Sequence, residues 1–392
     1  MNELREISTL LFIINLITMV AVILVIGIAP VVTRKSLLFG VRIPEEATTR
    51  AEVRKLKRNY INTMTIGGAI AIAILIAQYL LWPELSLLAV LYLPLLLIAL
   101  QFIIFVSLWK KAVELKAKNN WTVPMITTVD TSSAVQRERF WGFSKGWYIV
   151  SALIVVVLIV LSIMKYPSLP AQIPTHWGFD MQPDAWASKS LWSVLSMAII
   201  ALIFVVAMMF SNIIIYRMKL QVSTEHPELS YAQHRIYRRM MSEAIGVMTI
   251  ALTLFLGLLQ LMAIDVLRLT TTVMTVATVL MVLACCVPFT YIYIKAGQGG
   301  CKLKPIISET DVRMSSSTAR TSPKFNRGDD KFWKLGMFYY NEDDVSVLVE
   351  DRFGMNTGFN YARTSSKIVT VLLIIMTVAV YIGTTIIFFK MS

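Results

Sequence analysis

The chain has 392 residues, of which 56% are hydrophobic and only 16% are charged, and its formal net charge is +13. A composition this apolar excludes an ordinary soluble domain and predicts a membrane protein. The three cysteines, two of them adjacent inside an apolar run, exclude a disulfide framework.

Several apolar runs are long enough to cross a bilayer, because a spanning helix needs about 20 apolar residues. The runs are residues 8–32, 64–82, 85–108, 147–164, 191–216, 244–263, 270–294 and 368–389. We therefore predict an all-α polytopic membrane protein of about eight transmembrane helices, with a small cytoplasmic β-rich domain before the last helix. The first run is expected to be a retained helix, because its apolar stretch is too long for a cleaved signal.

The basic residues indicate the orientation, because cytoplasmic loops carry the excess of Lys and Arg. The segments rich in them are 33–63, 109–146, 217–243 and 295–367. With eight spans these segments fall on one side, so the protein is predicted to be a multi-pass cell-membrane protein with both termini extracellular. Each juxtamembrane Lys or Arg gains about 1 kcal/mol near anionic lipid. Membrane lipids are therefore expected partners, and nucleic acid is not.

The spans and the segments between them divide the chain into predicted parts. They are 1–63 (first span, a cytoplasmic FGVRIPEE loop and an interfacial helix), 64–146 (helical hairpin and cytoplasmic basic loop), 147–216 (two spans around an extracellular loop, 165–190), 217–295 (cytoplasmic basic loop and two spans), 296–330 (polar linker), 331–363 (small cytoplasmic β domain) and 364–392 (last span). The interfacial helix is expected to be capped near Thr48 or Thr49. His226 and His234, in the basic loop of residues 217–243, are expected to be solvated.

The β domain is predicted from aromatic and β-branched runs around a turn at residues 341–344, which read as two or three short strands. A sheet this small is marginal alone, so it should pack on other cytoplasmic loops or on a regulatory partner. The candidate contact residues are Arg42, Trp333, Tyr339 and Tyr340.

The extracellular stretch LPAQIPTHWGFDMQPDAWASKS holds the candidate ligand-binding residues. They are Pro174, Thr175, His176, Trp177, Asp180, Pro183, Asp184 and Trp186. His176, Asp180 and Asp184 would align on a helix, but the prolines argue against one, and zinc usually takes more nitrogen or sulfur ligands. We therefore predict no metal site. One reading is a structural turn anchored by tryptophans at the head groups; the other is a stiff loop that binds an extracellular peptide or a cell-surface lipid.

The apolar runs have no charged residue near their centres, which argues against an ion-coupled transporter. The intramembrane amides include Asn15, Gln101, Asn212 and Gln260. They either join helices through hydrogen bonds or, in a transporter or lipid-handling protein, converge on one polar cavity. No catalytic motif and no cofactor signature is present, so no catalytic residues are predicted. A membrane enzyme with an unrecognised site stays a third alternative.

The stretch from Leu169 to Trp177, followed by Gln182-Pro183-Asp184-Ala185-Trp186 and Ser188-Lys189, resembles the DUF1648 domain of SdpI-type bacterial immunity membrane proteins. Relatives commonly have a glycine two residues before the Pro-Asp, where this chain has Met181. Residues 39–44 resemble the Gly-Ile-Arg-Thr-Pro signature of the same proteins, and 332–361 resembles a DUF5808 domain. The resemblance implies a bacterial plasma-membrane protein that protects against, or senses, an extracellular toxic peptide.

Overall fold

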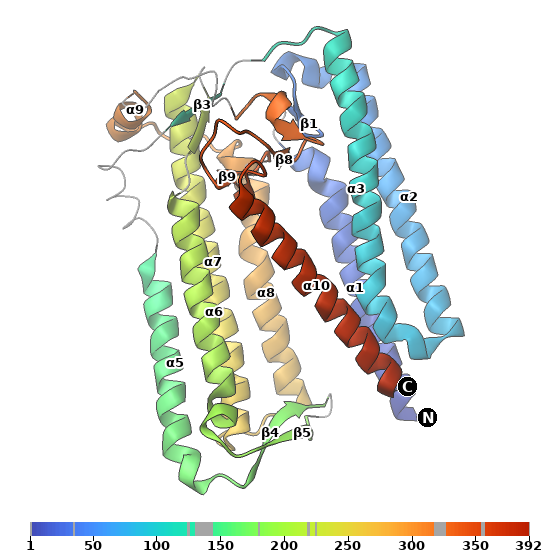
Figure 1. Ribbon diagram of the computed structural model, residues 1–392, viewed down its shortest axis with the longest axis vertical. Coiled ribbons are helices and arrows are strands. Elements are labelled where there is room, and N and C mark those ends of the chain that lie inside the picture. Colours follow the sequence, from blue (N-terminus) through green and yellow to red (C-terminus); the bar gives the residue numbers. More distant parts are fainter. Residues whose placement is uncertain are drawn as a thin grey trace. The chain divides into compact units, whose positions relative to one another are not determined.

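The computed structural model describes residues 2–33, 36–123, 126–129, 144–178, 181–217, 220–223, 226–316, 327–353 and 357–391. The chain forms two compact units (Figure 1). Unit 1 comprises Met1–Val129, Gln221–Pro227 and Ala319–Ser392, and unit 2 comprises Asp130–Leu220 and Glu228–Thr318. Unit 1 is therefore discontinuous in sequence.

All of the predicted apolar runs lie in long helices. Unit 1 contains α1 (Asn2–Val32), α2 (Ala51–Leu81), α3 (Ser86–Lys118) and α10 (Thr364–Met391); unit 2 contains α5 (Lys145–Lys165), α6 (Leu191–Arg217), α7 (Pro227–Ala263) and α8 (Thr271–Ala296). Seven of these helices are long and apolar enough to cross a membrane, and α1 adds the apolar segment Leu11–Leu24. The protein is thus an all-α polytopic membrane protein, as predicted.

Helices α2, α3 and α7 extend far beyond their apolar runs. The 31 residues of α2 and the 37 residues of α7 exceed the roughly 20 that a bilayer requires. The predicted interfacial helix is therefore the projecting end of α2, and much of the predicted basic loop 217–243 is the projecting end of α7. Thr48 and Thr49 end the 3₁₀ helix η1 (Glu45–Thr49), and Arg50 occupies the N-cap position of α2 without a side-chain hydrogen bond, so neither threonine caps that helix. The prediction that His234 is solvated was wrong: it lies on the packed face of α7 and is 3% exposed.

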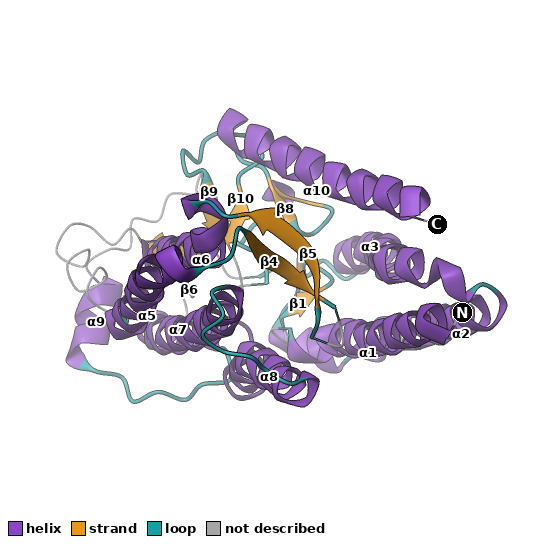
Figure 2. Cartoon of the chain, turned by 90° about the horizontal axis from the view of Figure 1, so that it is seen from below, coloured by secondary structure: helices purple, strands orange, loops and turns teal. Residues whose placement is uncertain are grey.

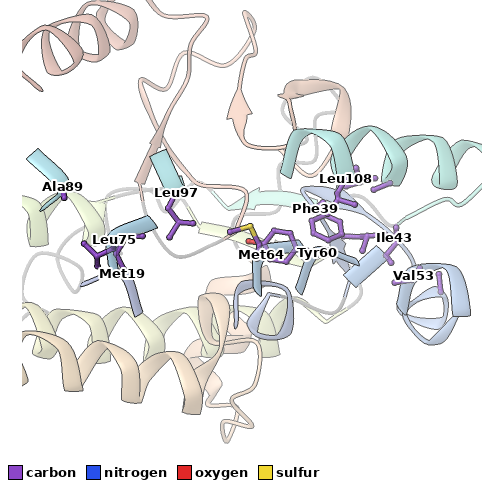
Figure 3. Close-up of a cluster of buried hydrophobic side chains, with 14 residues drawn as sticks. Met19, Phe39, Ile43, Val53, Tyr60, Met64, Leu75, Ala89, Leu97 and Leu108 are labelled. Atoms are coloured by element: carbon purple, nitrogen blue, oxygen red, sulfur yellow. The ribbon is translucent and has the colours of Figure 1, made fainter. Parts of the chain in front are cut away.

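The core of unit 1 continues from its helices into a small hairpin beyond them. Met19, Leu75 and Leu97 pack between α1, α2 and α3, and Phe39 and Ile43 belong to the same cluster (Figure 3). The hairpin pairs β1 (Leu37–Leu38) with β2 (Val41–Arg42), directly after α1. It is therefore anchored by apolar packing onto the projecting ends of α2 and α3.

Helix α10 is held differently, because none of the residues in its most apolar window is buried. Near its end, Thr385 exchanges a hydrogen bond of 2.7 Å with Tyr92 of α3. Tyr381 places its ring 5.7 Å from that of Tyr92. The remaining faces of α10 are available to lipid.

The β domain was predicted at residues 331–363; its described residues are 327–353 and 357–363, and they form four short strands where two or three were expected. They are β7 (Trp333–Lys334), β8 (Phe338–Tyr339), β9 (Leu348–Glu350) and β10 (Thr357–Phe359), which form the antiparallel pairs β7–β8 and β9–β10. Val345, which belongs to one of the β-branched runs, lies outside the strands and is exposed.

Two further elements lie outside the spans and the β domain. Helix α9 (Glu309–Ser316) lies within the predicted polar linker. Strand β3 (Ile126–Val129) pairs with β6 (Leu220–Ser223).

The interior of the β domain is polar as well as aromatic. Arg327 and Asp344 form a buried ion pair of 2.8 Å, and the Tyr339 hydroxyl donates to Asp344 at 3.1 Å. Burial, followed by the charge of Asp344, raises the pKa of Tyr339 to about 12. Burial alone would raise the pKa of Asp344, but the hydrogen bond and charge of Arg327 outweigh it and lower that pKa. Asp344 therefore stays ionised at neutral pH.

The β domain docks on the β1–β2 hairpin through two turns. Phe39 and Gly40 have φ of 48° and 82°, and Leu335 and Gly336 have φ of 53° and 76°. Positive φ at both central residues of the β1–β2 turn is the pattern of a type I′ hairpin. A Cβ atom on Gly40 would lie 2.2 Å from the carbonyl oxygen of Gly336. Only glycine allows the two turns to approach this closely.

Asp330 connects three parts of unit 1. Its carboxylate accepts hydrogen bonds from the backbone N–H of Arg42 at 3.1 Å and from Lys116 Nζ at 2.6 Å. It also accepts from Arg352, whose Nε donates to the carbonyl oxygen of Gly40 at 2.9 Å. These contacts confirm that the small sheet packs on another segment outside the spans.

Unit 2 contains α5, α6, α7 and α8, which group side by side in the view along their axes (Figure 2). Outside the spans, Arg235 of α7 binds Asp311 of α9 through two hydrogen bonds of 2.9 and 3.1 Å. Ser308 and Asp311 cap α9 reciprocally, with backbone N–H groups donating to each other's side chains. At the opposite ends of the helices, α5 and α6 are joined by residues 166–190.

We predict that Asp330→Ala loosens unit 1, because it leaves the buried Arg352 guanidinium without its carboxylate. Breaking such a pair costs about 3 kcal/mol. Amide hydrogen exchange of the detergent-solubilised chain should quicken in residues 36–42 and 327–353. Asp343→Ala, which removes an exposed carboxylate of the same domain, is the matched control. Equal exchange in the two variants would contradict the assigned role of Asp330.

Candidate functional site

The predicted extracellular loop is a β-hairpin. After η3 (Tyr166–Ser168), β4 (Gln172–Trp177) pairs antiparallel with β5 (Pro183–Ser188), with bulges on either side of His176. Sequence analysis predicted no strands here, because a proline within each strand obscured the pattern. A two-stranded hairpin has only edge strands, which tolerate proline.

The hairpin is anchored to the helix ends by a small apolar cluster. Ile173 of β4 is 1% exposed and packs with Leu169, Val194 of α6 and Ile264, which follows α7. Lys189 Nζ donates to the carbonyl oxygen of Leu169 at 2.8 Å. The hairpin therefore has a defined position over α6 and α7.

Met181, in the turn between the strands, has a strained backbone. The N–H of Gly178 donates to Gln182 O at 2.9 Å, and the N–H of Met181 donates to Gly178 O at 3.0 Å. Met181 has φ of 62°, in the left-handed region. This is the position at which the resembling proteins commonly have glycine, whose backbone adopts such a φ without strain.

A pocket of about 450 Å³ lies beside the hairpin. It is lined by two segments, one from the hairpin and one from the connection between α7 and α8. The lining residues are Leu169, Pro170, Ile173, Pro174, Trp177, Met181, Gln182, Pro183, Trp186, Met262, Ala263, Asp265, Leu267, Arg268 and Leu269. Its volume falls within the roughly 300–1,000 Å³ of small-molecule sites.

The pocket contains half of the predicted ligand-binding residues. Pro174, Trp177, Pro183 and Trp186 line it. Thr175, His176 and Asp184 do not belong to the lining, and Asp180 lies outside the described residues.

His176 and Asp184 bind each other. Nδ1 of His176 lies 2.5 Å from Oδ1 of Asp184, and their side chains are 69% and 52% exposed. Across the described ranges, no three His, Cys, Asp or Glu residues gather as metal ligands. The pair joins β4 to β5 by a cross-strand contact, which favours a structural role for these two residues.

Sequence analysis did not assign the connection between α7 and α8, residues 264–270, to the site. Arg268 binds Asp265 through hydrogen bonds of 2.9 and 3.2 Å, and the hydrogen bond from Arg268 lowers the pKa of Asp265. Asp265 itself has φ of 51°. The available signal was the short charged link between two apolar runs, but sequence alone could not place it beside residues 170–186.

The intramembrane amides of unit 2 have separate partners. Gln260 donates to Ser162 Oγ at 2.9 Å and to Val194 O at 2.7 Å, which joins α7 to α5 and α6. Asn212 donates to the hydroxyl of Tyr148 at 2.7 Å. These contacts favour amides as joints between helices over one shared polar cavity.

Two intramembrane amides of unit 1, Asn15 and Gln101, lie on α1 and α3, and Gln101 contacts a residue of α2. Asn15 is 1% exposed within α1, and Gln101 donates to the hydroxyl of Tyr60 at 3.5 Å.

The predicted inner contact residues serve contacts within the chain. Arg42 donates its backbone N–H to Asp330, Trp333 lies beneath the Arg352 guanidinium at 5.2 Å, and Tyr339 belongs to the β-domain core. Tyr340 donates its hydroxyl to Glu342 at 3.0 Å. Three of these residues therefore build or dock the β domain.

Comparison with known proteins shows a similarity over part of the chain. The domain of unknown function DUF1648 matches residues 153–202, which run from α5 through the hairpin into α6. No curated protein and no solved structure matches the chain significantly. The similarity therefore covers the hairpin of the site and its two flanking helices.

We predict that Met181→Gly stabilises the hairpin relative to Met181→Ala. Both changes remove the side chain beyond Cβ, so the comparison isolates the effect of Cβ on the backbone, and a left-handed non-glycine residue costs about 1 kcal/mol. Hydrogen exchange of amides 172–188 in the purified chain should be slower in the glycine variant. Faster exchange in that variant would contradict the strain assigned to Met181.

Proposed function

We propose that the chain is a bacterial plasma-membrane protein of the SdpI-like type that binds or senses an extracellular peptide or another envelope ligand. The pocket beside the β4–β5 hairpin is the observation that carries the proposal. It has the volume of a ligand site and is lined by Trp177 and Trp186, which pair across the hairpin with Pro183 and Pro174. A proline-braced aromatic surface loses little conformational entropy on binding.

The biological role that we propose is immunity or signal relay. It rests on the DUF1648 similarity at residues 153–202 and on the resemblance of the sequence to SdpI-type proteins. The distribution of Lys and Arg supports an orientation with the β domain in the cytoplasm and the hairpin outside. Such a protein would meet its ligand at the hairpin and a regulatory partner at the β domain.

The transporter alternative requires a polar path, which the amide contacts do not favour. In unit 2 Gln260 and Asn212 are engaged with different residues. A lipid-handling role remains compatible with a pocket at the helix ends. An outer-face enzyme would need catalytic groups in that pocket, and the charged residues lining it are Asp265 and Arg268.

We predict that Trp177→Ala and Trp186→Ala each reduce protection at least about tenfold, because each removes an aromatic anchor worth more than about 1.4 kcal/mol. Each variant is expressed in a strain that lacks the native gene and is challenged with diluted spent medium of the wild-type culture. Trp192→Ala, an exposed tryptophan outside the pocket lining, should protect like wild type.

In the same assay, joint replacement of His176 and Asp184 by alanine should have a smaller effect than loss of either pocket tryptophan. If all of these variants protect equally and are present at equal levels in the membrane, the hairpin pocket is not the ligand site.

We predict that Ser168→Cys is labelled in intact cells by a membrane-impermeant maleimide. Cys285→Ala and Cys286→Ala remove the two intramembrane thiols from the background. The exposed native Cys301, beyond the opposite end of α8, should react only after permeabilisation and serves as the internal control. The reverse pattern would overturn the proposed orientation.

A further inference from the structure

We propose that the pocket beside the β4–β5 hairpin takes one acyl chain of an anionic membrane lipid. This inference rests on the site of the proposed function and narrows its ligand class. A peptide is the competing occupant.

The first argument is the place of the pocket along the helices. Met262 and Ala263 end α7, whereas Leu267 and Leu269 immediately precede the capped start of α8 at Thr270. Ends of apolar spanning helices lie at the head-group level of a bilayer, and tryptophans such as those of the hairpin are enriched there. The pocket therefore lies at the membrane interface, next to the level at which acyl chains begin.

The second argument is the absence of a backbone N–H at three of the lining residues. Pro170, Pro174 and Pro183 all line the pocket, and proline has no N–H. An extended peptide that joins a strand edge depends on main-chain hydrogen bonds, which such an edge supplies poorly. An acyl chain requires only apolar surface, which Met181, Leu267 and the tryptophans provide.

The third argument is the charge at the rim. Arg268 is 87% exposed and uses Nε and Nη2 in its bonds to Asp265. A guanidinium has five N–H donors, so others are available to an anionic head group. Lys165, at the end of α5, also acts electrostatically on Asp265, so that Lys165, Arg268 and Asp265 together carry an excess of one positive charge.

The test is photo-crosslinking of the purified full-length chain in a non-ionic detergent. The probe is a long-chain fatty acid that carries a diazirine in its chain, and mass spectrometry locates the adducts. We expect saturable labelling of peptides that contain residues 169–186 and 262–269. Trp177→Ala should weaken the labelling about tenfold, whereas Trp192→Ala should not change it.

Two further arms test the head group and the competing occupant. The fatty alcohol of the same chain length should label more weakly than the acid in the native chain, and Arg268→Gln should remove that difference. A diacyl phosphatidylglycerol should compete for the site. Non-saturable labelling, or equal labelling of the Trp177→Ala and Trp192→Ala variants, would overturn the proposal.

Release of the probe by peptides fractionated from spent medium, without competition by phosphatidylglycerol, would show a peptide site and also overturn the proposal. These measurements do not depend on orientation or on protection of cells. Lipid binding without protection would therefore refute the proposed function alone, and protection without lipid binding would refute this inference alone.

Discussion

The contact between Arg352 and Asp330 is the constraint on which unit 1 depends. The Arg352 side chain is 3% exposed, and burial lowers its pKa to about 10, so it is still charged at neutral pH. A buried charge is tolerated only when its donors are satisfied. Asp330, the carbonyl oxygens of Gly40 and Gly328, and the ring of Trp333 together provide this environment.

This contact also has a consequence for how the chain folds. The bond from Arg352 to Gly40 joins residues 312 positions apart, and Arg42 and Asp330 are 288 positions apart. Unit 2 is synthesised between these partners. The β1–β2 hairpin must therefore wait for most of the chain before its docking partner exists, and contacts of such long sequence separation form slowly. The apolar packing of Phe39 and Ile43 on α2 and α3 does not depend on these late contacts.

The sequence predicted the spans well because hydropathy is a local property, and each apolar run became a helix. It also predicted the β domain, since aromatic residues cluster around the turn at Asn341. It did not predict the β4–β5 hairpin, because prolines such as Pro174 and Pro183 are read as strand breakers. The site was found only in part for a different reason. Trp177 and Trp186 stand out in sequence, whereas Met262 and Arg268 join them only through the packing of α7 against α5 and α6.

The way in which α10 is held limits how it can sit in a bilayer. At its start, Arg363 donates to the carbonyl oxygens of Glu342 and Asp344, and at its end Thr385 binds Tyr92 of α3. Its 28 residues span about 42 Å, whereas the hydrocarbon core is about 30 Å thick. A free helix of this length would adjust its tilt to each membrane. Because α10 is fixed at both ends, its tilt is set by its contacts with the rest of unit 1. The bilayer around α10 must therefore adapt its local thickness to the helix.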